Sequence, residues 1–148
     1  MKAVKTWIIV ADGARARVLC NDGPGKGIHQ LVAMAAETTD ATHELGSERP
    51  GRVNESVGSH RHAIQPRVDR HEAAEKEFAN RIAHYLDENA EQHSYERLVL
   101  VAPAKTLGYL RAGISKNSAR LVTGEVTKDL THTAIADLPA HLADVMAL

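Results

Sequence analysis

Arginine side chains gather in the stretch LGSERPGRVNES and in the residues that follow it. Between Gly46 and Arg70 the chain has five arginines and three acidic residues, so this segment carries +2 and the rest of the chain −3. The planar guanidinium group pairs well with phosphate, and a loop with spaced arginines can follow an RNA backbone and become ordered on contact. The sequence therefore indicates four candidate RNA- or phosphate-binding residues: Arg49, Arg52, Arg61 and Arg67.

These arginines lie in a long segment, residues 40–68, that has no clear helix or strand period. Compact domains rarely keep a loop of this length unless it is functional or disordered. Two histidines, His60 and His62, could add positive charge at mildly acidic pH. On composition alone, an RNA-binding loop and a merely solvated loop explain the segment equally well.

A second group of candidates consists of Asp12, Lys128 and Asp129, each of which follows an expected strand. We expect these strands to point the same way, so the three residues would share one edge of the sheet, where open α/β sheets tend to bind ligands. The alternatives are structural. Asp12 would then be the hairpin residue of a type I′ turn, and Lys128 with Asp129 an exposed turn pair.

The residues do not complete the active site of a known enzyme class. A two-metal nuclease needs several carboxylates at the sheet; Asp12 and Glu37 could contribute, but the strand before Pro103 ends without an acid. Cys20 could act as a nucleophile if His29 lay across the hairpin, although a thiol at the apolar end of a strand is usually only packed. We therefore assign no catalytic residue and expect a non-enzymatic protein.

No metal site or cofactor is expected either. The sequence HRH at 60–62 offers two histidines, and His71 is nearby. A zinc site requires a third and a fourth ligand whose place is known, and the sequence does not supply them. There is no P-loop and no Gly-x-Gly-x-x-Gly, and GPGKG precedes a strand instead of a helix that could cradle phosphate.

Composition is typical of a soluble globular protein. The chain has 148 residues, 43% of them hydrophobic and 25% charged, with a net charge of −1, which favours a single domain over residues 1–148. Aromatic residues are scarce at 3%, which argues against stacking of single-stranded nucleic acid. The apolar run near the N-terminus is too short for a signal peptide and no segment is long enough to span a membrane, so we expect a cytoplasmic protein.

The pattern of apolar residues predicts an α/β fold with one mixed sheet in the order β-β-β-α-β-α-β-α. Three meandering strands should feed a long helix, after which βα units extend the sheet in parallel, with the first strand near the middle as in ribonuclease H-like sheets. The expected strands cover residues 6–11, 14–20, 28–38, 97–104 and 120–127. The expected helices cover residues 69–89, 106–115 and 137–146. Asp69 and Asp137 are the expected helix caps.

Several blocks of the sequence resemble the bacterial host attachment family, whose members are described as required for attachment to host cells. The resemblance runs through nearly the whole chain, with small departures at Glu48, where aspartate is common, and at Ala104, where a second proline is common. The blocks are WIIVADGARARVL, SERPGRV, the helix from Asp69, LVLVAPAKTLGYLR, EVTKDLTH and LPAHL.

That family is in turn remotely similar to the middle domain of archaeal and eukaryotic class-1 release factors and their bacterial relatives. The resemblance implies a release-factor-like fold and places Ser47 to Arg67 where the release factor has a basic, ribosome-facing Gly-Gly-Gln loop. The motif is absent here, since Gln65 stands between Ile64 and Pro66. The resemblance thus implies binding of ribosomal or other structured RNA without catalysis. The alternatives are a protein partner in attachment without any RNA role, and a hydrolase of peptidyl-tRNA, another ester or a phosphodiester.

Overall fold

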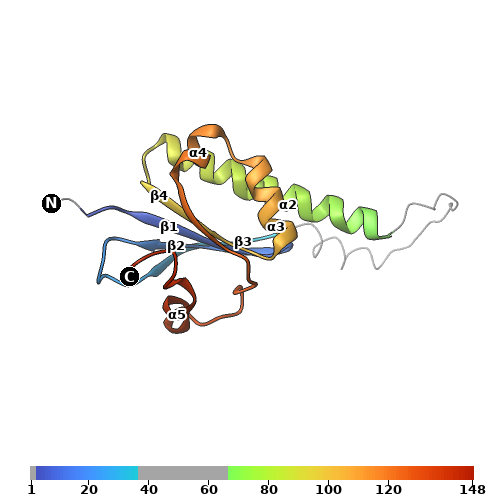
Figure 1. Cartoon of the computed structure of the whole chain (residues 1–148). Coiled ribbons are helices and arrows are strands. Elements are labelled where there is room, and N and C mark those ends of the chain that lie inside the picture. Colours follow the sequence, from blue (N-terminus) through green and yellow to red (C-terminus); the bar gives the residue numbers. More distant parts are fainter. Residues whose placement is uncertain (1–2, 37–66) are drawn as a thin grey trace, which may run out of the picture.

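The computed structural model describes residues 3–36 and 67–148, which form a mixed β-sheet with helices on both faces (Figure 1). The strands are β1 (Thr6–Ala11), β2 (Arg15–Asn21), β3 (His29–Ala35), β4 (Arg97–Val101) and β5 (Val122–Val126). The helices are α2 (Arg67–Glu91), α3 (Ala104–Gly113), α4 (Lys116–Leu121), the 3-10 helix η2 (Ile135–Asp137) and α5 (Leu138–Leu142).

The predicted mixed sheet with a central first strand is confirmed. Its strand order is β3-β2-β1-β4-β5, with β2 antiparallel to β1 and β3, and with β1, β4 and β5 parallel. Strands β1, β3, β4 and β5 therefore all end at one edge of the sheet, which we call the carboxyl edge. The likeness to ribonuclease H or to a release-factor domain stays a prediction.

Alternate residues of the central strands pack on opposite faces of the sheet, as the period of two in a strand requires. On β1, Trp7 and Ile9 belong to the core beneath α2 and α3, whereas Ile8 and Val10 belong to the core beneath α5. Because both faces are covered, β1 and β4 consist almost entirely of buried apolar residues. Figure 1 shows α2, α3 and α4 on one side of the sheet and α5 on the other.

Helix α2 rests on the sheet through Phe78, Ile82 and Leu86, as its apolar stripe predicts. Ala74, the expected first member of the stripe, is exposed. The helix also begins earlier than expected, at Arg67 instead of Asp69. Arg67 has no property that breaks a helix, and a proline before it is tolerable at a helix start, because the first N–H groups have no partner within the helix. The candidate Arg67 is thus in the first turn of α2 and not in a loop.

The last third of the chain departs most from the expected elements. The strand expected from residue 120 begins only at Val122, because Arg120 and Leu121 complete the short helix α4. Asp137 stands directly before α5, but its backbone is helical (φ −95°, ψ −8°) and its side chain makes no capping hydrogen bond. Helix α5 ends at Leu142, four residues earlier than expected.

Candidate functional site

Asp12 organises the turn at the carboxyl edge between β1 and β2. Its Oδ1 accepts hydrogen bonds from the N–H groups of Ala14 and Arg15, both at 2.8 Å, and its own N–H donates to the Arg15 carbonyl at 2.9 Å. The prediction of a type I′ turn from the Asp-Gly pair is wrong. Such a turn requires positive φ angles at its central residues, and Gly13 and Ala14 do not have them. The aspartate side chain replaces that geometry by binding the turn's N–H groups directly.

The loop after β5 packs against the same turn through Thr131. The Thr131 Oγ1 is 2.6 Å from Oδ1 of Asp129 and 3.3 Å from Oδ2 of Asp12. The hydrogen bond from the Thr131 side chain is the main reason that the pKa of Asp129 lies below its ordinary range. Two of the three edge candidates thus meet through a threonine that the sequence did not single out.

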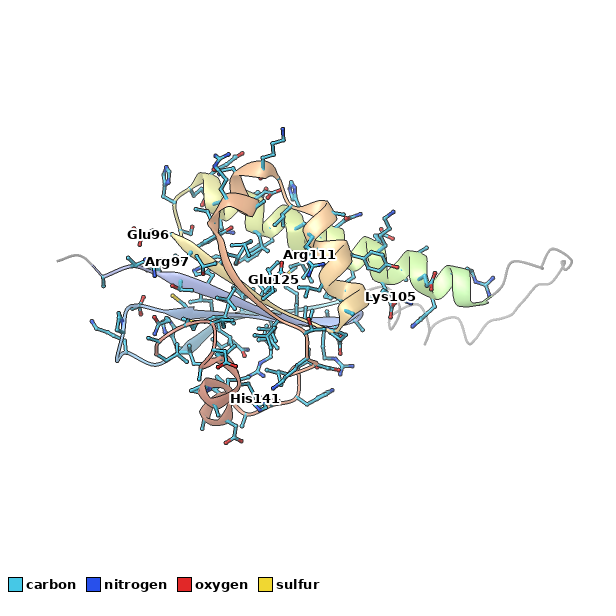
Figure 2. The ribbon with its side chains drawn as sticks, viewed as in Figure 1. Glu96, Arg97, Lys105, Arg111, Glu125 and His141 are labelled. Atoms are coloured by element: carbon cyan, nitrogen blue, oxygen red, sulfur yellow. The ribbon has the colours of Figure 1, made fainter. Side chains whose placement is uncertain are left out.

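Lys128, the third edge candidate, is directed elsewhere. Its Nζ lies 3.3 Å from Nδ1 of His141 in α5; Figure 2 labels His141 on the far side of the sheet from α3. Lys128 and Asp129 are both exposed, as in a turn pair, so the structure does not gather all three candidates at one point.

The two arginines of β2 bind the loop after β5, which lies beside the Asp12 turn. Arg17 donates through Nη1 to the carbonyl of Thr133 at 2.6 Å and through Nε to Oε1 of Gln30 at 3.0 Å. The Nη1 of Arg15 lies 2.6 Å from Nε2 of His132. The guanidinium group of Arg15 is about half exposed, so it also remains open to an anion from solvent. His132, like Thr131, is part of the block EVTKDLTH but was not among the candidate site residues.

A groove of about 450 Å³ opens on the other side of the Asp12 turn, between the starts of α2 and α3. Lys105 is exposed there and binds Oε2 of Glu72 at 3.0 Å, a contact that raises the pKa of the lysine. His71 lies 3.2 Å from Oε2 of Glu75. The carboxylates of Glu72 and Glu75 each have a basic partner, so acidic and basic groups alternate in and beside the groove. Its lining residues are Asp12, Gly13, Ala14, His71, Glu75, Pro103, Lys105 and Thr106.

Three of the four candidate arginines, Arg49, Arg52 and Arg61, lie outside the described residues. The structure nevertheless places the two ends of their segment. At the end of β3, the N–H of Ala36 donates to the carbonyl of Ala14 at 2.9 Å. At the start of α2, His71 and Glu75 line the groove. The described chain therefore stops at Ala36, beside the Asp12 turn, and resumes at Arg67, where the start of α2 projects beyond this edge of the sheet (Figure 1).

Cys20 and His29, considered as a nucleophile and its base, are opposite each other in the β2–β3 pairing. Burial, together with the nearby Asp22 carboxylate, raises the pKa of the Cys20 thiol to about 11. The thiol is therefore protonated near neutral pH, whereas a nucleophilic cysteine needs a thiolate. The geometry expected for this pair exists, but its electrostatics disfavour nucleophilic catalysis.

No helix in residues 67–148 is long and apolar enough to cross a membrane.

Comparison with known proteins identifies the family. No curated protein matches the chain. A solved structure titled "Archaeal protein" is similar over 95% of this chain and 40% of its own length, with 11% identity and a TM-score of 0.45; the chain thus spans less than half of that protein. A family model described as "Protein required for attachment to host cells" matches residues 7–142. Since the match covers nearly the whole sequence, the chain belongs to this host attachment family.

Proposed function

We propose that this protein binds structured RNA, such as ribosomal RNA, in the cytoplasm, through the arginine-rich segment 40–68 and the carboxyl edge beside it. The observation that carries the proposal is that the described chain stops at Ala36 beside the Asp12 turn and resumes in α2, whose His71 lines the groove next to that turn. In the sequence, the candidate arginines Arg49, Arg52 and Arg61 stand between these two points of the chain. No active-site chemistry is needed for this function.

The exposed cations on the described side of this edge include Arg15 and Lys105. The Arg15 side chain is 47% exposed and the Lys105 side chain 54% exposed. Their neighbours Asp12 and Glu72 compensate their charge, so the edge alone is a weak site for a polyanion. The positive charge of the arginine-rich segment supplies the missing attraction, and most of the affinity should come from contacts to phosphate.

The test measures co-sedimentation with ribosomes, and binding to a structured ribosomal RNA fragment, at several salt concentrations. Each neutralised phosphate releases counterions, so the logarithm of the binding constant should fall linearly with the logarithm of the salt concentration. The Arg49→Ala/Arg52→Ala variant should bind more weakly, and its salt slope should be smaller by about 0.7–0.9 for each phosphate that the variant no longer neutralises. Binding that depends neither on the salt concentration nor on Arg49 and Arg52 would overturn the proposal.

The matched control is Arg97→Ala/Arg120→Ala, which removes the same charge from the opposite edge. Arg97 begins β4 and Arg120 is in α4, just before β5, and both are exposed. Figure 2 shows Arg97 at the end of the sheet away from Lys105. This variant should bind RNA as the wild type does. An equal loss of binding in both double variants would mean a nonspecific charge effect and would also overturn the proposal.

The family description supports a second candidate, an interaction or regulatory protein needed for attachment to host cells that acts through a protein partner. A deletion strain complemented with Arg49→Ala/Arg52→Ala separates the two. If attachment depends on RNA binding, the variant should fail to restore it. If attachment returns fully while RNA binding is lost, the protein-partner function is favoured.

A hydrolase is the third candidate, and one assay discriminates it. Turnover of peptidyl-tRNA that is abolished by Asp12→Ala or Gln65→Ala would favour it over simple binding. Asp12 already accepts two turn N–H groups, so its loss should alter the turn. The Gln65→Ala variant is therefore the cleaner test.

A further inference from the structure

Three side chains with metal-binding atoms converge where β2 leads into β3, at the edge opposite the Asp12 turn. Cys20 and Asp22 come from the end of β2 and the residue after it, and His29 begins β3. The thiol sulfur, a carboxylate oxygen and an imidazole nitrogen all lie within 4.8 Å of one another. These are the three ligand types that zinc takes from proteins.

The separations within this cluster are close to those of a tetrahedral site. The Cys20 Sγ is 3.6 Å from Asp22 Oδ1, and the His29 Nδ1 is 3.8 Å from Asp22 Oδ2. Ligand atoms about 2.0–2.3 Å from a tetrahedral zinc ion are separated from one another by about 3.4–3.6 Å. The two distances reach different oxygens of the Asp22 carboxylate, so a rotation of that carboxylate and a closer approach of the thiol and the imidazole would complete the coordination by one oxygen.

The backbone around the cluster is fixed by a buried asparagine. Asn21 is 2% exposed; its Nδ2 donates to the Gly27 carbonyl at 2.6 Å and its Oδ1 accepts from the Gly23 N–H at 3.1 Å. These bonds tie together both ends of the loop that separates Asp22 from His29. The ladder pairing of Cys20 with His29 holds the other side. The ligands are therefore carried by a closed hairpin.

We propose that Cys20, Asp22 and His29 bind a zinc ion, with water in the fourth position. Cys20 is buried, Asp22 is partly exposed and the His29 side chain is 55% exposed, so the ion can enter and the open position faces solvent. On binding, the thiol S–H bond is replaced by an S–Zn bond and the proton goes to solvent. The dication then neutralises the Cys20 thiolate and the Asp22 carboxylate.

The experiment titrates the metal-free chain with Co²⁺, whose thiolate complex absorbs in the near ultraviolet, and then displaces it with Zn²⁺. The wild type should develop the sulfur-to-metal band and release one proton for each ion bound. Loss of a supporting outer residue typically costs 10–100-fold in metal affinity. Removing a ligand with Cys20→Ala or His29→Ala should therefore weaken Zn²⁺ binding by at least about tenfold, and Cys20→Ala should abolish the band.

The matched control is His84→Ala. His84 is an exposed histidine on α2 whose Nε2 lies 3.2 Å from Oε2 of Glu88, so it resembles His29 in its acidic partner but has no thiol beside it. Its loss should leave the band and the affinity unchanged. Because the His29 side chain is largely exposed, His29→Ala should fold normally even if Cys20→Ala does not. A missing band in the wild type, or a band and affinity unaffected by His29→Ala, would overturn the proposal.

Discussion

The guanidinium group of Arg111 binds both carboxylate oxygens of Glu125, with Nη2–Oε1 at 2.6 Å and Nε–Oε2 at 3.1 Å (Figure 2). This two-pronged pair joins α3 to β5 across 14 residues of sequence. It is one of the contacts that join the last strand to the helix layer. The hydrogen bond from Arg111 is the main cause that lowers the pKa of Glu125.

This pair predicts a pH dependence of stability. Because the Glu125 pKa is lower in the folded state than its ordinary value of 4.5, the pair should stabilise the fold above that pH and lose its effect as pH falls through the folded pKa. Arg111→Gln should therefore lower the Tm at pH 7 and not at about pH 2. The shift should be modest, because the pair is exposed to solvent. In Arg120→Gln, which within residues 3–36 and 67–148 removes a side-chain bond to the uncharged Asn117, no such pH-dependent difference is expected.

Thr131→Val should loosen the contact between the Asp12 turn and the loop after β5. The variant keeps the shape of the buried side chain but removes its hydrogen bond to Asp129, at an expected cost of about 0.5–1.5 kcal/mol in the free energy of unfolding. The pKa of Asp129 should rise toward its ordinary value of 3.8. Urea unfolding and a carboxyl NMR titration measure both effects. At the exposed Thr123 of β5, the same substitution should change stability by less than about 0.5 kcal/mol. Equal effects at the two sites would contradict the role given to Thr131.

Gly124 in β5 should not tolerate a side chain. A Cβ there would lie 2.7 Å from Cβ of Val145 and 3.1 Å from its Cγ1, so Gly124→Ala should destabilise the fold by about 1–3 kcal/mol. Adding Val145→Ala should recover only a small part of that stability, because it removes Cγ1 and Cγ2 but keeps the Val145 Cβ, which makes the shortest contact. In contrast, Gly108 in α3 has nothing within 4 Å of the equivalent position, so Gly108→Ala should stabilise the fold by about 0.5–1 kcal/mol. Thermal unfolding of these variants compares the outcomes.

The sheet and the main helix could be predicted because their signals are local. The buried apolar runs of β1 and β4 and the stripe that holds Phe78 and Ile82 on α2 depend only on residue order. The register was not predicted: that His29 lies across from Cys20 was only a condition of the nucleophile alternative, and the structure shows that the two residues do pair.

The candidate site could be predicted only in part, because contacts distant in sequence assemble it. The link from Asp12 to Asp129 passes through Thr131, whose hydroxyl bonds across 119 residues. Nothing in the local sequence marks Thr131 for that contact. The metal-binding cluster is hidden from the sequence for a related reason: Asp22 has the surroundings of a loop residue, and only the folded hairpin places its carboxylate beside both Cys20 and His29.

Helix α4, which takes the place of the first part of an expected strand, depends on Asp87 in α2. Its Oδ1 accepts hydrogen bonds from the N–H of Ser115 at 3.0 Å and from the hydroxyl of Ser118 at 2.6 Å. Ser115 in turn caps α4 through its hydroxyl, which accepts from the Ser118 N–H at 3.2 Å. Because Ser118 is fully buried, Asp87→Ala leaves its hydroxyl with a poorer partner. We expect a destabilisation of about 1–3 kcal/mol and faster amide hydrogen exchange across α4.

The neighbouring Glu88→Ala is the matched control for this prediction, since it removes a carboxylate from the same helix turn. The Glu88 side chain is 56% exposed and pairs only with His84 among the described ion pairs, so its removal should cost less than about 0.5 kcal/mol. Asp87→Asn retains an acceptor oxygen and should fall between the two. If exchange in α4 changes no more in Asp87→Ala than in Glu88→Ala, then α4 is held by the packing of Leu121 against the α2 core, and Asp87 does not determine where the helix ends and β5 begins.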